Sequence, residues 1–219
     1  VAAATADDVD QAVQSGKEAA EEWQSLRPAE RGRLINALAT RIREDTQRFQ
    51  QLLTLENGMS YSAAETYVEQ AARYFEYYAG IADKIQGESI PLGQEYVDYT
   101  VHEPYGVTAQ IVPWNFPMYL FGRSVAPALA AGNAAVVKPA RLTPLTAIEL
   151  GRLALEVGFP PGVLNIVPGR GSVAGAALAD HSDVGALSFT GSSGTGRLVA
   201  KTAAENVTSV HIELGGKSP

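Results

Sequence analysis

The sequence of 219 residues contains no cysteine and only three histidines. Disulfide bridges are therefore excluded, and an intracellular, cytoplasmic location is expected, because disulfides are typical of secreted domains. The histidines are scattered without the spacing of metal ligands, so no metal site is expected. An excess of positive charge is also lacking. The formal net charge of -7 argues against a nucleic-acid partner.

Long hydrophobic runs are missing as well. The longest stretch with almost no charge, residues 104–137, carries only Arg123 and is interrupted by prolines and glycines, so no membrane-spanning segment is expected. Residues 1–8 have no basic region before an apolar run, so no signal peptide is expected. A hydrophobic content of 46%, 21 glycines and 12 prolines suit a globular protein with many tight turns between short elements.

The N-terminal part of the chain has a helical pattern, because apolar residues recur three and four positions apart. A first helix is expected around residues 9–23. A second is expected from Pro28, a residue common at helix starts, to the stop signal at residues 57–58. A third, with a stripe of tyrosines expected in the core, covers residues 67–81.

The spacing of apolar residues changes at residue 95 from a helical to an alternating pattern. Side chains alternate through residues 95–102, which predicts an extended strand, and Gly106 turns the chain into the next one. Further strands are expected at 107–112, 134–137, 163–167, 186–189 and 209–213, and helices up to 131 and at 143–157, 172–179 and 195–205. Such alternation predicts an α/β fold with a doubly wound, Rossmann-like parallel sheet behind an N-terminal helical region.

Ligands of open α/β sheets bind at the carboxyl ends of the strands. Polar or glycine-rich segments follow five of the expected strands, at residues 113–115, 138–141, 168–171, 190–196 and 213–216. Each segment alone is equally explained by helix capping or by a turn. The glycine-rich one follows a strand and opens a helix, as phosphate sites do, but its glycines lack the usual Gly-x-Gly-x-x-Gly spacing. Phosphate binding and a plain glycine turn both remain open there.

Several motifs occur together in one order and spacing. They are Pro-Trp-Asn-Phe-Pro (113–117), Ala-Pro-Ala-Leu-Ala-Ala-Gly-Asn (126–133), Val-Lys-Pro (137–139), Gly-Phe-Pro-Pro-Gly-Val (158–163), Phe-Thr-Gly-Ser (189–192) and Glu-Leu-Gly-Gly-Lys-Ser-Pro (213–219). On these motifs the chain resembles the aldehyde dehydrogenase superfamily, whose members oxidise aldehydes with a nicotinamide cofactor through a cysteine thiolate. The helical part is similar to the same family more loosely.

The resemblance implies two catalytic residues. Asn115 matches the amide that donates to the aldehyde oxygen as it becomes an alkoxide, and an aimed donor of this kind is worth about 3 kcal/mol. Glu213 matches the general base that activates water against the thioester. Without the resemblance, Asn115 is also explained as a brace of a proline-flanked turn, and Glu213 as a capping or salt-bridged acid.

The resemblance also implies an NAD or NADP site. Lys138 matches the lysine that holds the adenosine ribose, Gly191 and Ser192 match the pyrophosphate site, and Gly171 would lie near the adenine. The other residues assigned to the cofactor cleft are Ile111, Val112, Pro113, Trp114, Ala140, Arg141, Thr195 and Leu214.

Two positions depart from the family pattern. Arg141 stands where many members have a glutamate that grips both ribose hydroxyls. Because a guanidinium can pair with a 2′-phosphate, NADP is expected to be tolerated or preferred. Arg123 and Ser124 stand where many members have Trp-Lys, a lysine associated with proton handling near the general base.

The family's nucleophilic cysteine lies a few dozen residues beyond the Glu-Leu-Gly-Gly-Lys segment. The chain alone is therefore not expected to complete the reaction, and we expect it to be part of a longer enzyme that acts on a small-molecule aldehyde. The alternative is a non-catalytic dinucleotide-binding or structural module, which the lack of cysteine favours. Residues 1–94 would form the helical part, 95–105 an oligomerisation strand of a homodimer or homotetramer, and 106–219 the incomplete cofactor-binding core.

Overall fold

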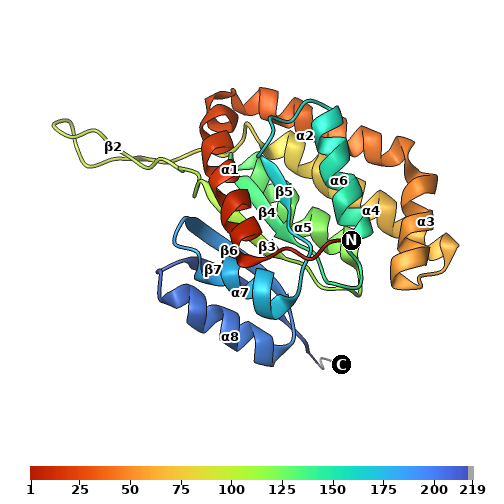
Figure 1. Cartoon of the computed structure of the whole chain (residues 1–219). Coiled ribbons are helices and arrows are strands. Elements are labelled where there is room, and N and C mark those ends of the chain that lie inside the picture. The colour runs from red at the N-terminus through yellow and green to blue at the C-terminus, as the bar shows by residue number, and fades with distance from the viewer. Residues whose placement is uncertain (217–219) are drawn as a thin grey trace.

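A five-stranded parallel sheet in the order β5-β4-β3-β6-β7 forms the centre of the computed structural model, which describes residues 1–216 (Figure 1). Its strands are β3 (Val107–Ile111), β4 (Ala134–Lys138), β5 (Leu164–Ile166), β6 (Val184–Gly191) and β7 (Ser209–Leu214). The helices are α1 (Ala6–Ser25), α2 (Pro28–Glu44), α3 (Thr46–Asn57), α4 (Tyr61–Ile81), α5 (Pro117–Ala130), α6 (Leu145–Glu156), the π-helical turn η1 (Gly171–Gly175), α7 (Ala176–Asp180) and α8 (Ser193–Ala204). The predicted doubly wound parallel sheet is confirmed.

Helices cover both faces of the sheet and create two hydrophobic cores. The larger core joins α2 to α6 with the inner residues of β4, and Trp23 of α1 enters it, where its indole N–H donates to the Leu129 carbonyl at 3.0 Å. The smaller core lies on the other face, where Val9 and Val13 of α1 pack with α7, α8 and side chains of β3 and β6. Among the helices described, none is both long enough and apolar enough to cross a bilayer.

The second predicted helix is in fact two helices, which is a correction to the sequence-based expectation. The break lies at Asp45, which ends α2 and precedes α3 with φ -95° and ψ 19°. Polar groups stabilise the corner, because the Asp45 carboxylate accepts two hydrogen bonds from Arg41 and the Thr46 hydroxyl donates to the Arg43 carbonyl at 2.6 Å. The apolar period continues through the break, so periodicity alone could not locate it.

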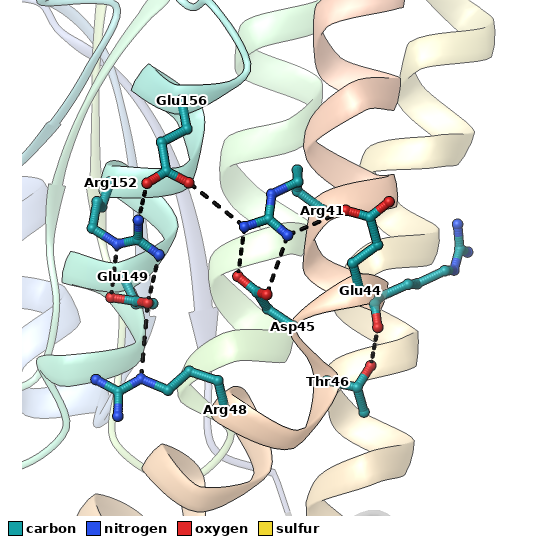
Figure 2. Close-up of polar contacts among 9 residues, drawn as sticks. Arg41, Glu44, Asp45, Thr46, Arg48, Glu149, Arg152 and Glu156 are labelled. Carbon is teal, nitrogen blue, oxygen red and sulfur yellow. Dashed lines mark hydrogen bonds and ion pairs between the residues drawn. The ribbon is translucent and has the colours of Figure 1, made fainter.

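A chain of ion pairs connects this corner to α6 (Figure 2). Arg41 pairs with Asp45 at 3.0 Å and with Glu156 of α6 at 3.6 Å, and Glu156 also pairs with Arg152. All of these side chains are partly exposed, so each pair adds little stability by itself. Their combined effect is to fix how the corner between α2 and α3 faces α6.

The expected strand over residues 95–102 is much shorter in the structure. Only β2 (Asp98–Tyr99) is a strand, and it pairs antiparallel with the unexpected β1 (Ser89–Ile90). This two-stranded arm projects away from the body of the molecule (Figure 1), and Val97 within it is 91% exposed. An extended segment needs a neighbouring strand to satisfy its backbone groups, and here only a short partner is present. Its proposed role in oligomerisation stays a prediction.

Helix α6 is capped by a carboxylate from another helix. Glu56, near the end of α3, accepts hydrogen bonds from the backbone N–H groups of Leu145 (2.5 Å) and Thr146 (3.2 Å) and from the Thr146 hydroxyl (2.5 Å). Burial raises the pKa of Glu56 above its usual value, although these hydrogen bonds act in the opposite direction. The cap therefore stabilises α6 but leaves a carboxylate in a poorly solvated place.

Replacing Glu56 by Ala is expected to lower the free energy of unfolding by about 1–2 kcal/mol, because three donors lose their acceptor. A raised folded-state pKa means that protonation favours the folded state, so the stability contribution of Glu56 is present at low pH and is lost as the pH rises through that pKa. Urea unfolding of the unmodified chain and of Glu56→Gln at about pH 4 and about pH 7 measures this. The unmodified chain should lose stability relative to Glu56→Gln as the pH rises, and the opposite trend would contradict the assignment.

Candidate active site

The carboxyl ends of four neighbouring strands meet at one edge of the sheet (Figure 1). The parallel register places Ile111 of β3 opposite both Lys138 of β4 and Phe189 of β6, and Gly191 opposite Leu214 of β7. The chain then leaves β3 into α5 on one face and leaves β6 into α8 on the other. In open α/β sheets, ligands bind at the place where consecutive connections diverge in this way.

The loop between β3 and α5 is held by hydrogen bonds. The Val112 N–H donates to the Lys138 carbonyl at 3.0 Å, and the side-chain amide of Asn57 donates to the Trp114 carbonyl at 2.7 Å. Trp114 and Asn115 are exposed, and the Asn115 side chain forms no hydrogen bond within residues 1–216. The loop backbone is therefore fixed while the Asn115 amide is available to a ligand. From the sequence, Asn57 is predicted only as a helix stop, and no motif around it predicts the hydrogen bond to the Trp114 carbonyl.

Lys138 ends β4, and most of its side chain is buried. The residue is 5% exposed, and its ammonium forms no ion pair or hydrogen bond with the residues that the structure describes. Burial lowers its pKa. Its aliphatic stem lies against Gly175, where an added Cβ would be 3.5 Å from Lys138 Cδ and 3.9 Å from Ile111 Cδ1. The ammonium at the end of this stem can donate to a ligand that brings oxygen acceptors, such as a ribose.

The start of α8 lies at the same edge. Ser192 is its N-cap, and the hydroxyl accepts from the Thr195 N–H at 3.3 Å and lies 2.9 Å from the Thr195 hydroxyl. Close packing explains two of the glycines in this turn. A Cβ on Gly196 would lie 2.5 Å from Leu214 Cδ2, and one on Gly191 would lie 2.6 Å from the Phe189 ring. Exposed N–H groups at a helix start attract anions, so the turn suits a phosphate while its glycines keep α8 close to the sheet.

Glu213 lies near the end of β7, at the same edge of the sheet. Its Oε1 is 3.2 Å from Nη2 of Arg123 on α5 and 3.4 Å from Nε2 of His211. The side chain is 44% exposed, so the carboxylate is ion-paired more than it is desolvated. Arg123 is recognisable from the sequence as a departure from the family pattern. Its contact with Glu213 is not, because the two residues lie on elements far apart in the chain.

The remaining predicted cofactor residues are spread along the same edge. Ala140 and the exposed Arg141 lie in the connection from β4 to α6, and the exposed Gly171 begins η1. Pro113 is partly buried in the loop after β3. Exposed residues from the connections after β3, β4, β5 and β6 therefore lie at this edge, beside the buried strand ends.

A parallel sheet with a switch in strand connections and a glycine-flanked helix start at its carboxyl edge is typical of nucleotide-binding α/β proteins. The family model of the aldehyde dehydrogenase family matches residues 1–219, and the chain belongs to that family.

Relatives of known identity agree with this assignment. The chain is 47% identical over 223 residues to aldehyde dehydrogenase family 2 member B4, mitochondrial, of Arabidopsis thaliana, covering 100% of the chain and 41% of that protein. It is 44% identical to human retinal dehydrogenase 2, covering 97% of the chain and 42% of that protein. The chain thus spans less than half the length of these relatives.

Solved structures show the same fold. PnpE from Pseudomonas sp. WBC-3, solved in complex with nicotinamide adenine dinucleotide, aligns with a TM-score of 0.97 at 46% identity, over 99% of this chain and 45% of that one. The NAD+ complex of aldehyde dehydrogenase from Bacillus cereus aligns with a TM-score of 0.98 at 42% identity, over 100% of this chain and 45% of that one.

Replacing Lys138 by Met is expected to stabilise the cofactor-free protein by up to roughly 1 kcal/mol, because partial burial disfavours the charged form of lysine. The same change should weaken NAD(P) binding by about tenfold or more, since a charged hydrogen bond to the ligand is lost. Thermal unfolding with and without cofactor measures both effects. Lys201→Met on the surface of α8 is the control and should change neither. A destabilised Lys138→Met protein with unchanged cofactor affinity would contradict the assignment.

Proposed function

We propose that residues 1–219 form the cofactor-binding part of an NAD(P)-dependent enzyme that oxidises an aldehyde to a carboxylic acid. The proposal rests on helix α5, which connects the loop of Asn115 with Glu213. This helix begins two residues after Asn115, and on its second turn Arg123 contacts Glu213. The Asn115 amide and the Glu213 carboxylate are the groups expected to act on the aldehyde. The first therefore precedes α5 and the second contacts its second turn, beside the strand end that carries Lys138.

Asn115 would stabilise the negative charge that develops on the aldehyde oxygen. Asn115 is exposed at the carboxyl edge of the sheet, on a loop whose backbone is held by Asn57. A neutral donor fixed in this way needs little reorganisation when the oxygen becomes an alkoxide, and this is the main advantage of a preorganised site.

Glu213 would take a proton from the water that releases the acid. The nucleophile would be a cysteine thiolate outside these 219 residues, which contain none. When bound, NAD or NADP supplies the acceptor for the hydride that leaves the aldehyde carbon. The residues of this chain hold the cofactor, orient the aldehyde oxygen and activate the water.

The proposal includes a small-molecule aldehyde as substrate, a homodimer or homotetramer as the working assembly and a cytoplasmic location. NADP as an accepted or preferred cofactor is also part of it, and rests on Arg141, which is exposed in the connection after β4. The NAD complexes of the two related structures support cofactor use at this fold.

A second candidate function is a dinucleotide-binding or structural module without catalysis. It is favoured by the lack of cysteine in the chain. Uptake of NAD(P) without aldehyde oxidation by the complete protein would favour the binding module, and loss of both would favour a structural one.

Replacing Asn115 by Ala in the complete enzyme is expected to lower kcat by about a hundredfold to a thousandfold, the usual cost of losing one oxyanion donor. Cofactor affinity should stay within about twofold, because the amide faces the aldehyde. Steady-state kinetics and cofactor titration measure the two quantities. Asn206→Ala, which removes an exposed amide bonded to the Asp180 carbonyl, is the matched control. An unchanged kcat in Asn115→Ala would exclude the oxyanion role.

Replacing Arg141 by Glu is expected to weaken NADP binding by about tenfold or more while leaving NAD binding equal or tighter, because a carboxylate repels the 2′-phosphate. Calorimetric titration of both cofactors against the unmodified protein and the variant compares these affinities. Arg170→Glu, an exposed arginine before η1, controls for the change of net charge. A strong NAD preference in the unmodified protein would refute this part of the proposal.

A further inference from the structure

Glu213 is held by a side chain from a different element. The Arg123 guanidinium reaches Glu213 Oε1 at 3.2 Å, and among the described residues Arg123 has no other ion-pair partner. The two side chains are 32% and 44% exposed, so the pair is in contact with solvent.

The strand itself gives Glu213 little support. Within residues 1–216, strand β7 is hydrogen-bonded only to β6, and its outward residues are exposed. Ser124, the neighbour of Arg123 on α5, cannot contribute, because its hydroxyl donates to the Leu120 carbonyl at 3.0 Å within the helix. Arg123 and the exposed His211 are therefore the side chains that orient the carboxylate.

Both partners bind the same carboxylate oxygen. The contacts with Arg123 and His211 are made to Oε1, at 3.2 and 3.4 Å, and no residue within 1–216 donates a hydrogen bond to Oε2. A carboxylate held through one oxygen can accept a hydrogen bond from water through the other. An arginine suits this task because its guanidinium is a strong cationic donor.

We propose that Arg123 is a positioning residue that holds Glu213 through Oε1 and leaves Oε2 free to accept a proton from water. The inference rests on the proposed function. In the step concerned, the water oxygen bonds to the acyl carbon of the thioester, one water proton passes to Oε2, and the carbon–sulfur bond breaks so that the thiolate leaves. Atoms and charge balance without a further reactant.

The test separates hydride transfer from release of the acid in the complete enzyme. After rapid mixing with aldehyde and cofactor, the burst of reduced cofactor reports hydride transfer, and the steady rate that follows reports later steps. Arg123→Met is expected to lower the steady rate about tenfold while the burst rate constant stays within about twofold. Arg123→Lys, which keeps the charge, should recover most of the steady rate. Arg43→Met breaks exposed pairs with Glu69 and Glu76 and should change neither phase.

Two results would overturn the positioning role while the enzyme remains active. An unchanged steady rate in Arg123→Met would show that Glu213 needs no such support. An equal fall of burst and steady rates, with a lower melting temperature, would show that the pair only braces α5 against β7. An unmodified enzyme without aldehyde oxidation would overturn the proposed function and the role of Arg123 with it, so the two failures are distinguishable.

Discussion

The parallel pairing of β3 with β4 and β6 is the constraint on which the rest of the structure depends. The register sets Ile111 beside Lys138 on one side and beside Phe189 on the other, so the segments that follow these strands begin at the same edge. Because parallel strands need crossover helices, the ladder also requires α5 and α8, and these leave on opposite faces. The position of the candidate site at this edge is thus a consequence of connectivity, and the side chains at the strand ends would make it specific.

Helix α5 transmits this constraint to the candidate catalytic groups. It begins with Pro117, and Met118 and Phe121 bury one side of it in the larger core, each 1% exposed. Packing of this kind leaves the helix little freedom to shift, since interiors are close-packed. The loop that precedes α5 presents Asn115, and the exposed side of the helix presents Arg123 to Glu213. Core packing on one side of the helix therefore controls geometry on the other.

The sequence predicted the order of strands and helices from residue 107 onward because local signals agreed there. Short apolar runs, a glycine or proline at the turns and amphipathic helices all indicate the same α/β pattern. The break at Asp45 was missed, because the apolar period runs unchanged from α2 into α3 while polar contacts of the corner interrupt the helix. The strand β1 was missed because two residues in an exposed arm carry no periodic signal.

The candidate site could be predicted only in part. Motif resemblance indicated Asn115, Lys138 and Glu213, and the structure places them along one edge of the sheet. The contacts that hold their surroundings join elements far apart in the chain: Asn57 to the Trp114 carbonyl, Glu56 to the start of α6, and Arg123 to Glu213. Such pairs form only in the completed tertiary fold, so no local sequence pattern predicts them.

Hydrogen–deuterium exchange of the protein with and without NAD+ or NADP+ tests the central claim most directly, namely that the carboxyl edge of the sheet is the cofactor site. Slower exchange on cofactor addition is expected in peptides that cover residues 111–115, 138–141 and 191–196, with little change in the arm at residues 89–99. Cofactor binding without protection of those strand ends, or protection confined to another surface, would contradict it.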